Sequence, residues 1–332
     1  MASSITTLLD AFSIAELWNR ALNGKQEPPL FDARIVTTDG NPVTAYGNVR
    51  LQADMAASDV EQTDCVIISP ILPNITPMPG DLDILCQWIE KMRARGSVIA
   101  TVCTGAFILA EMGFLDGKKA TTNWQYARMF KKKYPRVRLE PEHMLTEDDN
   151  IICTGAATAV YNLGIHLIRK YGSQDLATAC SKALLIDPNR HSQAPYALST
   201  PLQAHGDAQV LKAQDLIEKG YATIETVDDI ARTVGISPRH FKRRFKKATG
   251  EMPLKYLQRV RIDAAKERLE STRESIDKIT WAVGYQDISS FSRLFKQHTR
   301  ISPKAYREKF FNQAPRQEDG DTVPDRAFRQ TA

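Results

Sequence analysis

The chain has 332 residues, of which 42% are hydrophobic and 25% are charged, and its formal net charge is +5 at pH 7. This length and composition suit two domains with separate hydrophobic cores, and no apolar stretch is long enough to cross a bilayer. The start of the chain lacks the basic and apolar segments of a secretory signal, and the five cysteines are not closely spaced. We therefore expect a cytoplasmic protein with no disulfide bonds and no membrane partner.

The charge is unevenly distributed along the chain. Residues 207–311 hold 22 Lys and Arg against 14 Asp and Glu, whereas residues 1–206 hold 19 against 21. A basic region of about 100 residues indicates a polyanionic partner, most simply nucleic acid, or else a solvated basic surface. The stretch 188–206 contains prolines and has no helical periodicity. We predict an N-terminal domain over 1–187, a linker over 188–206, a basic domain over 207–311 and a disordered tail over 312–332.

Predicted strands and helices alternate in the N-terminal part. We expect helices over 5–19 and 82–95, and short buried strands over 64–69, 97–102 and 150–152. Alternation of this kind is typical of an α/β domain with a mostly parallel sheet, in which ligands bind beyond the carboxyl ends of the strands. Cys103 and Cys153 both fall at such strand ends, and Cys153 is interpreted as structural.

Cys103 lies in a turn between a strand and a helix. Because a helix N-terminus favours a thiolate, this position could activate the sulfur in the way that a nucleophile elbow does. The alternative is that Cys103 is a small buried residue. The histidines have no metal-binding spacing, and no phosphate-loop or dinucleotide motif occurs. We therefore expect neither a metal nor a cofactor.

The basic part contains an internal repeat with a period of 50 residues, seen for example in the pair Phe241 and Phe291. Each copy predicts a helix, a glycine turn and a second helix, over 226–249 and 276–299. Gly235 and Gly284 are expected to end the first helices, and Ser237 and Asp287 to cap the second ones. Between the copies we expect one long helix over 253–270. Its apolar side is predicted to contain Leu254, Leu257, Val260, Ala264 and Leu269.

The second helix of each copy has an apolar face and a polar face. The residues predicted to be buried are Phe241, Phe245 and Ala248 in the first copy and Phe291, Leu294 and Phe295 in the second. The opposite faces carry Arg239, Lys242, Arg243 and Lys246, and Ser289, Ser292, Arg293 and Lys296. Such helices fit the major groove of DNA, where arginine and lysine reach bases or phosphates. Two solvated amphipathic helices are the alternative.

Residues 208–311 resemble the DNA-binding domain of AraC-family transcription regulators. The matching stretches are I-A-R-T-V-G-I-S-P-R-H-F-K-R-R-F-K-K-A-T-G and W-A-V-G-Y-Q-D-I-S-S-F-S-R-L-F-K-Q-H-T-R-I-S-P-K-A-Y-R. The resemblance implies that double-stranded DNA is the partner and that base contacts fall on Arg239, Lys242, Arg243, Ser289, Ser290 and Arg293. The full predicted set of DNA-binding residues is Arg239, His240, Lys242, Arg243, Lys246, Ser289, Ser290, Ser292, Arg293 and Lys296.

The N-terminal part is similar to the ThiJ/PfpI-type, class I glutamine-amidotransferase-like domain, which has a flavodoxin-like α/β fold. The resemblance rests on A-T-V-C-T-G-A-F-I-L-A around Cys103 and L-D-G-K-K-A-T-T-N-W at 115–124. It implies a ligand pocket at Asp10, Cys103, Thr104, Asn123 and Trp124, although Asp10 is also consistent with a solvated helix residue.

Two departures from the family pattern matter. Asn123 stands where the enzymes have a histidine, and an asparagine cannot act as a general base. The chain also begins almost directly in a helix where the family has a strand first. Either the sheet lacks a strand or the true start lies upstream.

We expect a sequence-specific transcription regulator that forms a homodimer and whose non-catalytic N-terminal domain senses a small-molecule effector. The order of the two domains resembles a subgroup of amidotransferase-like transcription regulators. The alternative is a cysteine-dependent hydrolase or amidotransferase with an appended DNA-binding module. A redox sensor that uses Cys103 is a third possibility.

Overall fold

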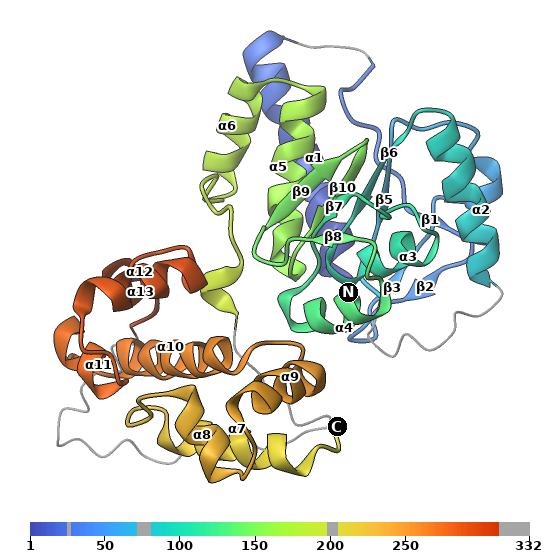
Figure 1. Cartoon of the computed structure of the whole chain (residues 1–332). Helices are drawn as coiled ribbons and strands as arrows, with labels where there is room; N and C mark the ends of the chain where they lie inside the picture. Colours follow the sequence, from blue (N-terminus) through green and yellow to red (C-terminus); the bar gives the residue numbers. More distant parts are fainter. Residues whose placement is uncertain (25–27, 72–80, 198–204, 312–332) are drawn as a thin grey trace, which may run out of the picture. The chain divides into compact units, whose positions relative to one another are not determined.

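The chain forms two compact units, Met1–Leu198 and Ser199–Ala332 (Figure 1). The structure is a computed structural model that describes residues 1–24, 28–71, 81–197 and 205–311. The predicted tail over 312–332 and residues 198–204 of the predicted linker lie outside these residues. No helix within the described ranges is both long and apolar enough to cross a membrane.

The N-terminal unit is built on a four-stranded sheet in the order β5-β6-β10-β9. β5 (Cys65–Ile68), β6 (Val98–Thr101) and β10 (Ile151–Thr154) are parallel, and β9 (Leu145–Asp148) pairs antiparallel with β10. Every residue of β6 and β10 is buried, because helices cover both faces of the sheet. The predicted α/β fold with a mostly parallel sheet is confirmed.

Helices from separate parts of the chain cover the two faces of this sheet. α1 (Ser3–Asn23), α5 (Val160–Tyr171) and α6 (Gln174–Ala183) share one core with Val98, Ala100 and Ile152 of the strands. The other core joins Ile99 and Ile151 to α2 (Asp81–Ala94), α3 (Ala106–Glu111) and α4 (Ala127–Lys133). Neighbouring strand residues enter opposite cores because side chains alternate along a strand.

Several short elements complete the N-terminal unit. The paired short strands are β1 (Val36–Thr37) with β4 (Met55–Ala56), β2 (Val43–Thr44) with β3 (Arg50–Leu51), and β7 (Lys119–Ala120) with β8 (Arg138–Leu139). The 3-10 helices are η1 (Ala57–Asp59), η2 (Cys103–Gly105), η3 (Trp124–Tyr126), η4 (Ala157–Ala159) and η5 (Ala194–Tyr196).

Residues 188–197 belong to the N-terminal unit, although the sequence reads as a linker from residue 188 onward. Gln193 is only 1% exposed, and its backbone N–H donates to the carbonyl of Glu142 at 2.9 Å. Ala194 and Pro195 are also buried. Apart from the short 3-10 helix η5, this stretch is held by long-range contacts, so it has no periodicity from which its packing could be predicted.

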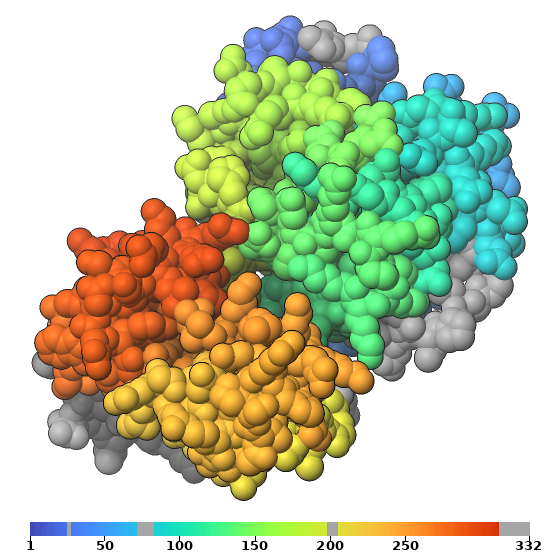
Figure 2. Space-filling model, viewed as in Figure 1, coloured from blue at the N-terminus to red at the C-terminus, as the bar shows by residue number. Residues whose placement is uncertain are grey.

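The C-terminal unit is entirely helical in its described part. Its helices are α7 (Ala208–Gly220), α8 (Val227–Thr233), α9 (Pro238–Thr249), α10 (Pro253–Ser271), α11 (Ile276–Ala282), α12 (Ile288–Thr299) and α13 (Pro303–Phe310). Two cores lie side by side along α10: Tyr256 and Leu257 enter the first, and Ile262 and Leu269 enter the second. In Figure 2 the two repeats form adjoining lobes, coloured yellow to orange and orange to red.

The two copies of the repeat are alike in detail. In the first, the rings of Phe245 and Tyr256 pack edge to face at 5.3 Å, and the Tyr256 hydroxyl donates to Glu218 at 2.5 Å. In the second, Phe295 and Tyr306 pack at 5.4 Å, and the Tyr306 hydroxyl donates to Glu270 at 2.5 Å. α10 therefore serves both as the last helix of the first copy and as the first helix of the second.

Some predicted details of this unit are wrong. Leu254 is 54% exposed, because Tyr256 and Leu257 already occupy the inward face at the start of α10. Ser237 precedes α9 but makes no side-chain cap, whereas Asp287 does cap α12. Ala248 and Leu294 are only half-buried. The buried position at the end of each second helix is instead a threonine, Thr249 or Thr299.

We predict that the two glycine turns tolerate alanine differently. Both glycines have left-handed backbone, with φ of +74° at Gly235 and +87° at Gly284. A Cβ at Gly235 would meet nothing within 4 Å, whereas one at Gly284 would lie 2.5 Å from the carbonyl oxygen of Ala222. Gly235→Ala should lower the free energy of unfolding by about 1–2 kcal/mol, from backbone strain alone. Gly284→Ala should lower it by about 3–4 kcal/mol, because overpacking is added to that strain.

Urea denaturation of the whole chain, followed by circular dichroism, measures both losses. Equal losses for the two variants would contradict the close packing of Gly284 against the turn that contains Ala222.

Candidate nucleic-acid interface and ligand pocket

The predicted DNA-facing residues lie on the outer faces of α9 and α12. Phe241 and Phe245 on α9, and Phe291 and Phe295 on α12, are all fully buried, and this sets which side of each helix faces solvent. The members of the predicted set that are exposed are Arg239, His240, Arg243, Lys246, Ser289, Arg293 and Lys296. Those that are half-buried are Lys242, Ser290 and Ser292.

The basic residues of α9 differ in their partners. Arg244 donates to Asp207 at 2.5 Å and also to Gln209, so it ties α9 to the start of α7. Lys242 forms an ion pair with Asp228 of α8 at 2.9 Å. Arg239, Arg243 and Lys246 form no ion pair with any residue in the described ranges. Their charges therefore remain available to a polyanion.

α12 begins with the cap at Asp287 that the sequence predicts, but the sequence does not indicate that Ser290 is its partner. Asp287 accepts a hydrogen bond from the backbone N–H of Ser290 at 2.6 Å. Hydrogen bonds from the side chain and backbone of Ser290 lower the pKa of the Asp287 carboxyl, and Arg293 acts in the same direction. Ser290 thus supports the start of the helix, while Ser289 and Arg293 face solvent.

Cys103 occupies a strained turn at the carboxyl end of β6. It is 6% exposed, and its φ of +56° lies in the left-handed region, which is costly for a residue with a Cβ. Gly105 follows in the same turn, where a Cβ would lie 2.8 Å from the carbonyl oxygen of Ile68. Thr122 donates its hydroxyl to the Cys103 carbonyl at 2.8 Å and stabilises the turn. The elbow geometry expected from the sequence is present.

Asn123 lies against the thiol of Cys103. Burial raises the pKa of this thiol above its ordinary value, while hydrogen bonds from the Asn123 side chain and from Thr104 act in the opposite direction. The Asn123 side chain also accepts from the backbone N–H of Gln125 at 3.0 Å. The net direction is upward, so the sulfur is a thiol at neutral pH. Cys153 is fully buried, and burial raises its pKa to about 11.

Gln193 is a residue of this site that no sequence pattern indicates. Its carboxamide nitrogen lies 2.8 Å from the carbonyl of Thr122 and 3.2 Å from the hydroxyl of Thr121. Its carboxamide oxygen accepts from the backbone N–H of Trp124 at 3.4 Å. The bonded residues are about 70 positions apart in sequence, so no local pattern relates them.

Comparisons with known proteins agree with these two units. The model of the DJ-1/PfpI family matches residues 29–170, and a model described as a helix-turn-helix domain matches residues 230–309. The HTH-type transcriptional regulator CdhR of Pseudomonas aeruginosa is 24% identical over 275 residues, which cover 82% of this chain and 81% of that protein. The HTH-type transcriptional regulator GlxA of Rhizobium meliloti is 28% identical, over 67% of this chain and 68% of that protein.

The chain therefore combines a DJ-1/PfpI domain with an AraC-type helix-turn-helix domain, and it is similar to HTH-type transcriptional regulators. A crystal structure of an AraC family transcriptional regulator from Pseudomonas putida is similar over 55% of this chain and 93% of that chain, with 19% identity and a TM-score of 0.46.

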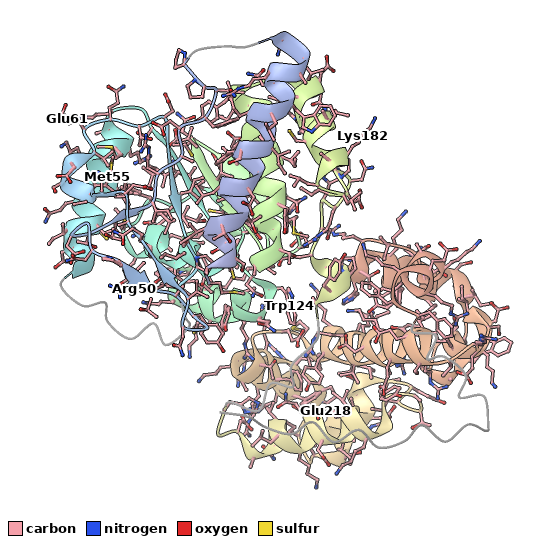
Figure 3. The ribbon with its side chains drawn as sticks, turned by 180° about the vertical axis from the view of Figure 1, so that it is seen from behind. Arg50, Met55, Glu61, Trp124, Lys182 and Glu218 are labelled. Carbon is pink, nitrogen blue, oxygen red and sulfur yellow. The ribbon has the colours of Figure 1, made fainter. Side chains whose placement is uncertain are left out.

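The predicted pocket residues of this regulator do not all lie together. Thr104 and Asn123 both hydrogen-bond to the thiol of Cys103. Trp124, labelled in Figure 3, follows Asn123 in the chain. Asp10 is exposed on α1. The charged groups that act on the thiol include the N-terminus of Met1 but not Asp10, so nothing links Asp10 to the other four.

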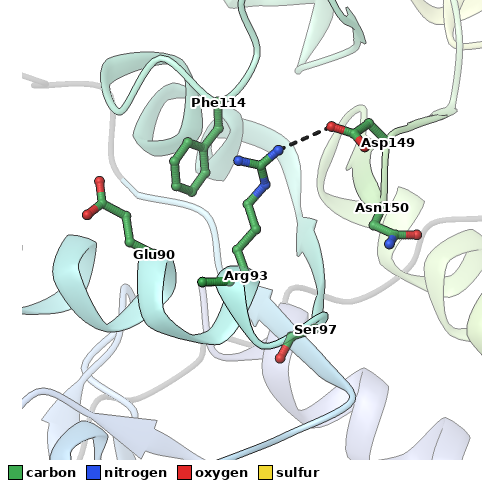
Figure 4. A pocket seen from close by; sticks show the side chains of 7 residues that line it. Glu90, Arg93, Ser97, Phe114, Asp149 and Asn150 are labelled. Atoms are coloured by element: carbon green, nitrogen blue, oxygen red, sulfur yellow. Dashed lines mark hydrogen bonds and ion pairs between the residues drawn. The ribbon is translucent and has the colours of Figure 1, made fainter.

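Two hollows of the regulator lie away from the thiol. One, of about 340 Å³, contains Arg93, which pairs with Asp149 at 3.1 Å and lies over the ring of Phe114 (Figure 4). Its residues Ser97 and Asn150 precede β6 and β10, so it lies at the opposite end of the sheet from Cys103. The other, of about 990 Å³, lies along α6 and residues 185–191.

Among the described residues, no three His, Cys, Asp or Glu side chains form a group that could hold a metal ion.

We predict that Cys103 of this regulator reacts slowly with iodoacetamide at pH 7. Only the thiolate attacks, and burial holds the thiol pKa above its ordinary value, so the rate should still be rising above pH 9. Asn123→Ala removes a hydrogen bond that lowers this pKa, and it should move the midpoint of the rate to still higher pH. Peptide mass spectrometry after timed labelling measures the midpoint.

Gln125→Ala is the matched control, because Gln125 is exposed beside Asn123. A midpoint below the ordinary thiol pKa in the unmodified protein would mean an activated nucleophile and would contradict this description.

Proposed function

We propose that this regulator recognises specific double-stranded DNA sequences through α9 and α12, acting in the cytoplasm, and that its DJ-1/PfpI domain binds a small-molecule effector without catalysis. The observation that carries the DNA part is the duplication. Two helices with buried phenylalanines present cations at equivalent positions, Arg243 with Arg293 and Lys246 with Lys296, all exposed. A solvated surface would not require the same cations in both copies.

The geometry of α10 supports simultaneous binding by the two helices. α10 has 19 residues and is therefore about 28 Å long. The first core packs on its beginning and the second on its end. Successive major grooves on one side of B-form DNA are about 34 Å apart. A rigid helix of this length suits a protein that places one recognition helix in each of two successive grooves.

The two recognition helices should contribute differently. α9 carries Arg239, Lys242 and Arg243, which suit guanine edges and phosphates. At the equivalent positions α12 carries Ser289 and Ser292 beside Arg293, and serines contact bases without adding charge. We therefore assign more of the salt-dependent affinity to α9.

We predict that Arg243→Ala and Arg293→Ala each weaken specific DNA binding by about 1–3 kcal/mol, or roughly 5- to 150-fold, because each removes a base-reading guanidinium. Fluorescence anisotropy measures the loss, with a duplex selected from a random pool by the unmodified protein.

Arg232→Ala is the matched control. Arg232 is exposed on α8 and pairs with Asp229 of the same helix, so its loss should change the dissociation constant less than twofold. If Arg243→Ala, Arg293→Ala and Arg232→Ala behave alike, α9 and α12 are not the recognition helices.

The absence of catalysis is supported by the partner of Cys103. An acyl-transfer enzyme needs a base to take the proton of the nucleophile, and the side chain beside this sulfur is the amide of Asn123. Burial keeps the sulfur protonated at neutral pH. Cys103, Thr104, Asn123 and Trp124 at the carboxyl edge of the sheet therefore suit binding better than hydrolysis. A cysteine-dependent hydrolase remains the alternative, and hydrolysis lost specifically in Cys103→Ser would favour it.

We further propose that the regulator is a homodimer that associates through α1. This helix buries Leu8, Ala11 and Phe12 against the sheet side of the unit, yet Leu17, Trp18 and Leu22 are 65%, 40% and 52% exposed. A cluster of exposed apolar side chains marks an interaction surface. A second copy of the same helix would bury this cluster symmetrically.

Replacing both leucines, in Leu17→Glu/Leu22→Glu, should weaken dimerisation at least about 100-fold. Burying a leucine contributes about 1.5–3 kcal/mol, and the two losses add. Sedimentation velocity measures the oligomeric state. Leu254→Glu, at a leucine that is equally exposed on α10, is the control and should leave the dimer intact. A dimer that survives the double replacement would exclude α1 as the interface.

A further inference from the structure

Gln193 is an enclosed polar side chain beside the Cys103 site. It is 1% exposed. Its carboxamide nitrogen lies near three acceptors, the carbonyls of Thr122 and His143 and the hydroxyl of Thr121, at 2.8, 3.2 and 3.2 Å. A buried amide that loses such partners is strongly disfavoured, since no water replaces them. Gln193 therefore stays docked only while residues 121–124 keep their position.

Residues 121–124 are also the wall of the Cys103 site. Thr122 donates to the carbonyl of Cys103 at 2.8 Å, and the side chain of Asn123 bonds to the thiol. A single segment thus contacts Cys103 on one side and Gln193 on the other. Any molecule that seats against the thiol and moves Asn123 also disturbs the partners of Gln193.

The space around Gln193 leaves little freedom. A Cβ added at Gly155 would lie 2.7 Å from the carboxamide of Gln193. Gly155 follows β10, and its backbone N–H donates to Met144. The carboxamide is therefore confined between the end of β10 and residues 121–124. It therefore has little room to shift within this position.

Gln193 also stands at a particular place along the chain. It directly precedes η5, and the DNA-binding unit begins a few residues later, with its first described residue at His205. The backbone of this segment is held by Gln193 N–H to Glu142 at 2.9 Å and Met144 N–H to His191 at 2.9 Å. Loss of the docked carboxamide would loosen the segment that continues into the DNA-binding unit.

We propose that Gln193 is the positioning residue that couples the Cys103 site to DNA binding. In the structure, the carboxamide of Gln193 is docked on residues 121–124, and its backbone N–H is held by Glu142. When a ligand displaces Asn123, residues 121–124 move, Gln193 undocks, and the segment entering the DNA-binding unit is released. This inference rests on the proposed function and adds the route by which effector binding reaches DNA.

A double-mutant cycle on DNA affinity tests the coupling in the full-length protein. Cys103→Met fills the site with a larger side chain that keeps the same Cβ, so it acts as a permanent occupant. Gln193→Met has a similar length but makes no hydrogen bonds. Cys103→Met alone should change the dissociation constant for the selected duplex at least fivefold. In the Gln193→Met background the same replacement should change it less than twofold, because the coupling residue is already undocked.

The proposal is overturned if Cys103→Met changes the dissociation constant equally in the two backgrounds. It is also overturned if Cys103→Met changes the dissociation constant in neither background. Specific DNA binding would still stand in both cases. If the unmodified protein binds no duplex specifically, the proposed function is refuted instead. Gln174→Met, at an exposed glutamine on α6, is the control and should leave the effect of Cys103→Met unchanged.

Gly155→Ala provides an independent route to the same state, should Gln193→Met not fold. Its Cβ would push the carboxamide of Gln193 out of place without altering Gln193 itself. Hydrogen exchange in peptides covering 121–126 and 193–197 should then become faster in both together, while the peptide covering 160–171 in α5 is unchanged. If residues 121–126 keep their protection in Gly155→Ala, Gln193 does not hold the wall of the site and the coupling is excluded.

Discussion

Two pairs of buried phenylalanines, packed on the two ends of α10, determine where the cations of the DNA-binding unit lie. A helix that buries Phe241 and Phe245 has only one way to face, and Arg243 and Lys246 then point outward. Because burying each ring is worth a few kcal/mol, this orientation outweighs the repulsion among the clustered positive charges. The second copy repeats the arrangement on the same helix. The spacing between the two surfaces is therefore a property of α10 rather than of a loop.

The DJ-1/PfpI domain keeps the architecture of a reactive cysteine but changes its partner. The positive φ at Cys103 and the close approach of Gly105 to Ile68 place the sulfur at the carboxyl edge of the sheet, where ligands of α/β folds bind. An amide in place of a base leaves a buried thiol with hydrogen-bonding neighbours. Backbone strain of this kind persists only where the surrounding packing enforces it. Under the proposed function, this strain supports a site that binds an effector without catalysis.

Recognition in one unit can influence the other only through the chain that joins them or through contacts between them. Gln193 stands near the end of the N-terminal unit, and its carboxamide packs against the segment 121–124 that includes Asn123. Under our proposal, the connecting segment takes part in the response to the effector. Coupling of this kind needs an element with two alternative states. In our proposal, that element is the carboxamide of Gln193, and the two states are docked and undocked.

Features that depend on local periodicity can be predicted from the residues alone. The 50-residue repeat, the buried phenylalanines, the glycine turns and the turn at Cys103 all follow from spacing within a helix, a strand or a single turn. The structure alone showed what depends on contacts distant in sequence. Gln193 meets Thr121 across 72 positions, and Arg244 meets Asp207 across 37. Leu254 is exposed because neighbouring residues of α10 had already filled the core. Periodicity identifies the apolar side of a helix, but only the packed neighbours decide how much of that side is covered and which polar groups find partners.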